Sequence, residues 1–331
     1  MRSKAMAGLL TIILALSFAQ AAAEPVAWEL VNEYPASALP GEADTYFAAA
    51  INQRLAGKLT VKPVFDAASG LRSKDQLKAV ATGRFAMADT FGGAAGDDHA
   101  LLLLSSLPFL APSADHAKIL FDLARPAYER VFAAMNQKLL YVSPWPPSGL
   151  WATGPIGDIA ALKALKVRTY DKTGTDVLTR VGAIASVVSF ADLNAKLESG
   201  EINAVLSSGD GGAGRQLWKY LKHFADVGYA IPLSFSTVNL DAWKSLDETS
   251  RSAIESVAVE TTARQWAAMT GRVERNFIRM RENGVTIDDS PPSDVSAALR
   301  LAADAALADW LSRAGAEGKK LLDDYNARVR R

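Results

Sequence analysis

Arg168 is the residue whose type and position best suit binding chemistry in this sequence. It lies in a short segment with the composition of a strand, Lys166 to Tyr170. A guanidinium offers a planar pair of donors that matches a carboxylate, so it fixes the orientation of an acid as well as balancing its charge. Within a strand, such a group faces water, pairs with a carboxylate of its own chain such as Asp171, or faces a cleft that receives a ligand carboxylate.

Side chains that catalyse reactions or hold metal ions are scarce. The three histidines, at positions 99, 116 and 223, are not spaced to share a metal ion, and the chain has no cysteine. It also lacks the Gly-x-Ser-x-Gly segment that presents a serine nucleophile. The glycine-rich segments 92–96 and 209–214 lack the ending of a phosphate loop, so we expect mobile loops there. The sequence predicts no metal and no cofactor, and it favours ligand binding over catalysis.

The first 23 residues have the layout of a secretory signal, with a basic start, an apolar run and small residues typical of a cleavage site at Ala21 to Ala23. The alternative, a membrane anchor, needs about 20 apolar residues, and this run is shorter. We therefore expect a cleaved signal peptide at residues 1–23 and an exported mature chain. The whole chain has 36 basic and 36 acidic residues, which gives no reason to expect nucleic acid as a partner.

The mature chain begins with alternating strand and helix patterns. We expect strands at 27–31, 59–65 and 85–89, a helix that ends at Gly57, and a helix at 73–82. This order is typical of an open parallel sheet covered by helices. A helical region at 114–136, interrupted near Pro126, and a strand at 139–142 follow. A later strand at 236–240 is expected to return to this unit.

A second strand and helix set follows a stiff crossover at 145–149. Strands are expected at 166–170, 185–188 and 204–207, and helices at 176–181, 190–199 and 217–223. Asp247 then begins a helical pattern that reaches Asn283. A helix of roughly 35 residues spans about 50 Å, so it should touch both units. Amphipathic segments at 295–310 and 317–329 complete the chain.

In the order of several segments, the chain resembles the extracytoplasmic solute-binding subunits of tripartite ATP-independent periplasmic (TRAP) transporters, the DctP-like family. Leu107 to Leu110 resembles the family's Leu-Pro-Phe turn. Residues 159–168 resemble its helix-to-strand segment, which ends in a carboxylate-binding arginine. Residues 190–204, and Trp243 to Leu246 followed by the long helix, resemble two more of its motifs. The likeness covers nearly the whole mature sequence.

The resemblance implies an α/β, two-lobed, periplasmic-binding-protein-like fold. Each lobe is a mostly parallel sheet flanked by helices, and hinge strands and a long interdomain helix join the lobes. Residues 24–146 plus 234–265 are assigned to lobe 1, 147–233 plus 285–331 to lobe 2, and 247–283 to the helix that spans both. The resemblance further implies a periplasmic protein, expected to be a monomer, that delivers a small organic acid to the small and large TRAP membrane subunits.

By the same resemblance, Arg168 holds the ligand carboxylate. The family often has a second, upstream arginine where this chain has Pro147 to Trp151, and the family's usual asparagine is replaced in Leu206 to Asp210. The missing cation argues against a dianion, while aromatics near the predicted lobe edges favour an apolar or aromatic body on one carboxylate. The predicted ligand-binding residues lie at strand ends or are these aromatics. They are Arg168, Tyr34, Ser69, Asp89, Thr90, Phe91, Trp145, Trp151, Tyr170, Ser207, Ser208 and Phe235.

Two other functions are compatible with the sequence. A ligand-binding partner of a sensor or chemoreceptor would keep the fold, and neighbouring genes for membrane transport subunits would argue against it. A secreted enzyme that uses cleft carboxylates would alter candidate acids chemically, and no pair of carboxylates in the sequence supports it.

Overall fold

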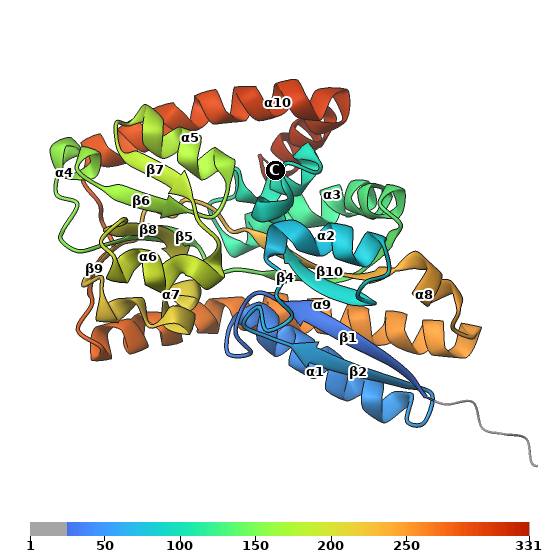
Figure 1. Ribbon diagram of the computed structural model, residues 1–331. Helices are drawn as coiled ribbons and strands as arrows, with labels where there is room; N and C mark the ends of the chain where they lie inside the picture. The colour runs from blue at the N-terminus through green and yellow to red at the C-terminus, as the bar shows by residue number, and fades with distance from the viewer. Residues whose placement is uncertain (1–24, 331) are drawn as a thin grey trace, which may run out of the picture.

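The computed structural model describes residues 25–330, so the predicted signal peptide at 1–23 lies outside the described residues. Two sheets with helices on their faces form two lobes that lie side by side (Figure 1). The predicted α/β class and two-sheet architecture are therefore confirmed. Between residues 25 and 330, no helix combines the length and the apolar composition that a membrane crossing requires.

The first sheet has the strand order β2-β1-β3-β10-β4, and only β10 runs against the others. The predicted alternation of strands and helices is confirmed here, with boundaries that differ by a few residues. The strands are β1 (Val26–Asn32), β2 (Leu59–Val64), β3 (Met87–Phe91), β4 (Gln137–Pro144) and β10 (Leu233–Asn239). The helices are α1 (Leu39–Arg54), α2 (Ser73–Ala81), η1 (Gly92–Ala95), η2 (Ala100–Ser106), α3 (Ala114–Ala134) and α8 (Leu240–Lys244).

The second sheet has the order β11-β9-β5-β8-β6-β7, and only β5 runs against its neighbours. Its strands are β5 (Ser148–Ala152), β6 (Lys166–Thr169), β7 (Ile184–Val187), β8 (Ala204–Ser208), β9 (His223–Ala225) and β11 (Thr286–Asp288). Its helices are α4 (Ile159–Lys163), α5 (Lys172–Arg180), η3 (Phe190–Asp192), α6 (Leu193–Glu198), α7 (Gly209–Arg215) and η4 (Leu217–Lys219).

One long helix, α9 (Glu248–Glu282), touches both lobes, as the length of its pattern predicts. The carboxylate of Asp247 accepts a hydrogen bond from the Ser250 amide at 2.6 Å and so begins the helix. α9 contacts α1 and β4 in the first lobe and α7 and β11 in the second. Figure 1 shows it, in orange, running along the same side of both lobes.

The last helix, α10 (Ser293–Val329), also crosses from one lobe to the other. It bends at Gly315, whose φ of 61° favours a residue without a side chain. Before the bend α10 lies beside α5, and after it the apolar residues Leu321, Leu322 and Tyr325 pack into the core that contains α3. The assignment of all of 285–331 to lobe 2 therefore needs correction, because the segment after Gly315 buries its apolar face against lobe 1.

The two glycine-rich segments are packed, and the expectation of mobile loops is wrong for both. Residues 92–95 form η1, and residues 209–215 form α7. A Cβ atom on Gly92 would lie 2.6 Å from the Phe235 ring, and one on Gly212 would lie 2.0 Å from the Trp151 ring. Glycine is present because large aromatic side chains lie directly against the backbone, which leaves no room for a side chain.

Three other local predictions are wrong. The helix around Pro126 is not interrupted, since α3 runs from Ala114 to Ala134 with Pro126 inside it. Residues 217–223 hold only a short turn, since Gln216 has a φ of 53° and β9 starts at His223. The crossover at 145–149 already contains the start of β5.

Candidate functional site

Two adjoining cavities lie between the lobes at the carboxyl ends of the strands. The larger has a volume of about 720 Å³ and is lined by residues from both lobes. The smaller, about 20 Å³, has room for roughly one water molecule. Five residues line both cavities, so the two spaces share a wall: Tyr34, Phe91, Arg168, Tyr170 and Phe190.

Arg168 lies in this shared wall and is 2 % exposed. It belongs to β6, between β7 and β8, and its side chain is held by backbone carbonyls at the ends of those two strands. Its Nε donates to the Val188 oxygen at 2.8 Å, and its Nη1 donates to the Leu206 oxygen at 3.3 Å. These neutral acceptors hold the guanidinium in place and leave its charge unbalanced.

No carboxylate neutralises Arg168 within residues 25–330, since none of the described ion pairs includes it. Its Nη2 also has no hydrogen-bond partner in that part of the chain. Burial lowers the pKa of Arg168, while nearby Tyr34, Glu33, Tyr170 and Asp171 act to raise it. The alternatives in which Arg168 faces bulk water or pairs with Asp171 are therefore both excluded in this conformation.

Five rings form an aromatic cluster around Arg168, and we use that name for Tyr34, Phe91, Trp145, Tyr170 and Phe190. The Tyr34 ring centroid is 4.6 Å from that of Trp145 and 4.4 Å from that of Phe190. Phe91 and Tyr170 meet edge to face at 5.2 Å. Because Phe91 ends β3 while Tyr170 follows β6, this last contact joins the two lobes, and the wall it forms is mainly apolar.

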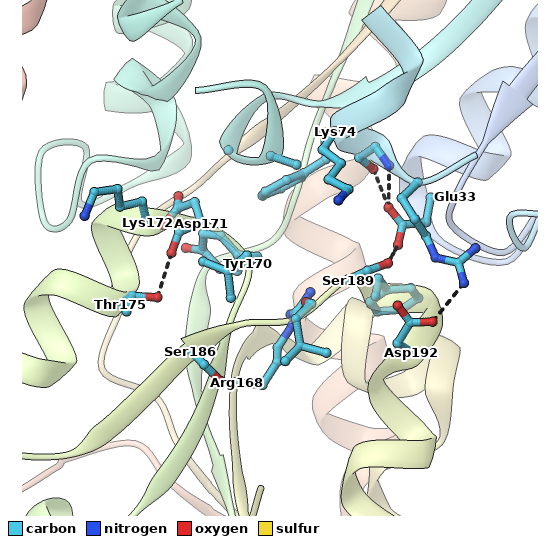
Figure 2. A pocket seen from close by; sticks show the side chains of 18 of the residues that line it. Glu33, Lys74, Arg168, Tyr170, Asp171, Lys172, Thr175, Ser186, Ser189 and Asp192 are labelled. Atoms are coloured by element: carbon cyan, nitrogen blue, oxygen red, sulfur yellow. Dashed lines mark hydrogen bonds and ion pairs between the residues drawn. The ribbon is translucent and has the colours of Figure 1, made fainter. Parts of the chain in front are cut away.

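Glu33 is a buried carboxylate whose two oxygens are fully used. Directly after β1, it accepts hydrogen bonds from the amide and hydroxyl of Ser73, both at 2.7 Å, within the first lobe. Its other oxygen accepts from the Ser189 hydroxyl and, at 3.0 Å, from the Ala191 amide of the second lobe (Figure 2). Burial alone would raise the pKa of Glu33, but the bonds from Ser189, Ser73 and Ala191 outweigh it and lower that pKa.

Asp171 is a buried carboxylate with only one oxygen used. It caps α5 by accepting from the Gly174 amide at 2.7 Å through Oδ1. Its Oδ2 is buried without a hydrogen-bond partner in the described chain. Burial raises the pKa of Asp171 to about 7, although the Gly174 bond and the charge of Arg168 act against the change. Figure 2 shows Asp171, Tyr170 and Arg168 around the larger cavity.

A third carboxylate, Asp210, ties α7 to α9 and α1 behind the cavities. Its Oδ1 accepts from Nε of Arg272 at 2.5 Å and from the side-chain Nδ2 of Asn276 at 3.1 Å. Its Oδ2 accepts from the Leu39 amide at 2.7 Å. Arg272 also donates to Glu42 at 2.8 Å, so one guanidinium links both lobes to the long helix.

The structure brings seven of the twelve predicted binding residues to the cavity walls: Arg168, Tyr34, Phe91, Trp145, Tyr170, Ser207 and Ser208. The other five line neither cavity. Asp89 and Thr90 are buried within β3, where Asp89 lies beside Asp44 of α1. Ser69 lies in a surface turn, where its hydroxyl accepts from the Leu71 amide. Trp151 packs on Phe224 at 5.3 Å, and Phe235 packs on Tyr128 at 4.8 Å.

Several cavity residues were not predicted from the sequence. In the smaller cavity they are Ser148, Phe190, Gly211 and Pro232, and in the larger they include Glu33, Asp171 and Ser189. Glu33 and Asp171 directly follow strand ends, so the strand-end rule that selects Tyr34 and Tyr170 would also have selected them. Phe190 carries only the pattern of a core residue. In residues 25–330 no group of three or more His, Cys, Asp or Glu side chains is placed to hold a metal ion.

Comparisons with known proteins agree with this geometry. The family model described as bacterial extracellular solute-binding protein, family 7 (DctP), matches residues 31–312. Among curated protein sequences, no relative matches.

Solved structures of solute receptors are also similar over almost the whole chain. DctP7 of Bordetella pertussis, a receptor binding pyroglutamic acid, is 26% identical with a TM-score of 0.88, and the match covers 91% of this chain and 99% of that one. DctP6 of the same organism, also binding pyroglutamic acid, is 27% identical with a TM-score of 0.87, over 91% and 100%. A marine metagenome TRAP solute-binding protein specific for pyroglutamate is 26% identical with a TM-score of 0.87, over 92% and 99%.

Proposed function

Because this chain belongs to family 7 of the bacterial extracellular solute-binding proteins, the DctP family, we propose that it captures a small organic acid in the periplasm for a TRAP transporter. Arg168 binds the carboxylate of the acid, and the aromatic cluster packs against its body. The loaded receptor then delivers the acid to the small and large membrane subunits.

The state of Arg168 is the observation that supports this proposal most. A buried guanidinium that faces a cavity without a carboxylate partner leaves electrostatic energy available for an incoming anion. Removal of water around the acid when the lobes close would strengthen this contact. Two backbone carbonyls already fix the guanidinium of Arg168, so little side-chain entropy is lost when the acid binds.

The number of buried charges favours a single carboxylate. The larger cavity is also lined by Arg72, Lys172 and Lys196, each of which pairs with a carboxylate of the chain, and by Lys74, which is exposed and has no ion pair in the described chain (Figure 2). Water screens an exposed lysine, so it contributes less to anion binding than a buried cation. Arg168 is the buried cation among the lining residues. We therefore propose a monocarboxylate with a compact, largely apolar body, and pyroglutamate is the first candidate because three similar receptors bind it.

Calorimetric titration of the Arg168→Ala variant with a panel of small acids tests the proposal. Loss of the buried cation should weaken binding of the best acid by about 2–5 kcal/mol. Arg125→Ala, which breaks an exposed ion pair between neighbouring turns of α3, is the matched control and should leave affinity unchanged. Unchanged affinity in Arg168→Ala would refute the anchoring role.

A further inference from the structure

Four buried side-chain oxygens have no hydrogen-bond partner in the described chain, and two of them belong to residues that line the larger cavity. They are Oδ2 of Asp171, Oγ of Ser106, and the hydroxyls of Tyr170 and Tyr229. A buried polar atom without a partner costs about 1–3 kcal/mol, so such atoms are rarely left together unless something else bonds to them.

These atoms belong to one region of the molecule. Burial raises the pKa of Tyr170 and of Tyr229, and the charge of Asp171 adds to both increases. Asp171 and Ser106 belong to opposite lobes, and both side chains lie close to Gly93. Asp171 and Tyr170 line the larger cavity together with Arg168, and Asp171 Oδ2 lies beside Gly93, which lines the same cavity.

Gly93 keeps that space open. A Cβ atom at this position would lie 2.5 Å from the Phe91 ring, 3.0 Å from Asp171 Oδ2 and 3.1 Å from Ser106 Oγ. Any side chain would therefore cover the unpartnered carboxylate oxygen. The backbone at Gly93 needs no left-handed conformation, so this close approach accounts for the glycine.

We propose that Asp171 is a second recognition group of the same site, which accepts a hydrogen bond from an N–H close to the carboxylate of the bound acid. This rests on the proposed function, with Arg168 holding the carboxylate. The cargo then belongs to the class of small cyclic acids that carry an N–H, such as lactam and imino acids. Asp171 is suited to this task because Oδ1 is fixed by the Gly174 amide and Oδ2 remains free.

The test compares two acids that differ only in this donor. Pyroglutamate is paired with 5-oxotetrahydrofuran-2-carboxylate, in which oxygen replaces the ring N–H. For the wild-type protein, calorimetry should give an affinity for the preferred N–H acid at least about tenfold above that for its oxygen analogue, since the analogue leaves Asp171 unpaired. Equal affinities within the pair would overturn the inference, and this readout needs no variant.

Asp171→Asn sharpens the result, because asparagine can still cap α5 while an N–H₂ group can replace the acceptor oxygen. Affinity for the N–H acid should fall at least about tenfold, and affinity for the oxygen analogue should hold or increase. Asp158→Asn, the same change at the exposed cap of α4, is the matched control and should alter neither affinity. Equal loss for both acids would overturn the inference.

The outcomes also separate this inference from the proposed function. If N–H-free acids bind, Arg168→Ala abolishes their binding and Asp171→Asn does not change the preference, then the function stands and the role of Asp171 is wrong. If no acid binds to the wild-type protein, both are wrong.

Discussion

Glu33 and Asp171 lie in the same space between the lobes and have the same 2 % exposure, yet their surroundings are opposite. Glu33 accepts four hydrogen bonds from both lobes, and its pKa is lowered. Asp171 accepts one local bond to Oδ1, and its pKa is raised to about 7. Burial therefore does not decide what a carboxylate does. A carboxylate whose bonds are all made within the chain holds the lobes together, while one with a free oxygen can bind something from outside.

The largest effect should come from removing the positive charge that balances Asp210. Arg272→Met removes the closest partner of Asp210, which is 2 % exposed, and leaves a buried charge behind. Removal of one partner of a buried pair costs about 3–5 kcal/mol, so urea denaturation should show a loss of that size. Arg54→Met, which breaks the exposed pair with Glu260, is the control and should change stability little. Similar losses in both variants would contradict the prediction.

Glu33→Gln should destabilise the folded protein by about 2 kcal/mol, because one acceptor oxygen becomes an N–H₂ group that faces N–H or O–H donors. The folded pKa of Glu33 lies below its ordinary 4.5, so its stabilisation is complete above that value and is lost as the pH falls through the folded pKa. The difference in unfolding free energy between wild type and variant should thus shrink on acidification. A difference that stays constant down to low pH would show that Glu33 does not act through its charge.

Asp171→Asn should instead increase the unfolding free energy in the absence of ligand. With a folded pKa of about 7 against an ordinary 3.8, ionised Asp171 destabilises the folded state increasingly as pH rises between those values, and fully above them. The variant should gain about 1–3 kcal/mol of unfolding free energy at pH 8 and almost nothing near pH 4. Denaturation curves at both pH values provide the check. A loss of stability at pH 8 would show that ionised Asp171, like Glu33, stabilises the folded state.

The smallest effect is expected at the ion pair between Arg72 and Asp192. This pair also joins the lobes, at 2.8 Å, but its side chains are 32 % and 48 % exposed. Water and salt screen such a pair, so Arg72→Met should cost less than about 1 kcal/mol. A thermal shift series with rising salt should bring wild type and variant together. A loss of stability as large as that of Glu33→Gln would show that the contribution of such an interaction depends on its position between the lobes and not on its burial.

Sequence patterns predicted the long elements well and the site only in part. The periodicity and the cap residue placed α9 at 247–283, and the structure has it at 248–282. β5 was missed because all five of its residues are buried and it therefore lacks the alternation of a half-exposed strand. The partners of Glu33 in the second lobe are 156 and 158 residues away along the chain, so no local pattern could reveal its four bonds. Arg168 could be singled out because residues 159–168 resemble the family's helix-to-strand segment, which ends in a carboxylate-binding arginine.

The continuous α9 has a consequence for how cargo is signalled. α9 contacts both lobes, and a rigid helix that keeps these contacts would favour opening by rotation about its axis over separation of the lobes along it. A transporter subunit that contacts both lobes would then respond to the angle between them and not to the chemistry of the bound acid. Receptors for different acids could share one docking surface for that reason, since each would have the same arrangement of lobes when its acid is bound.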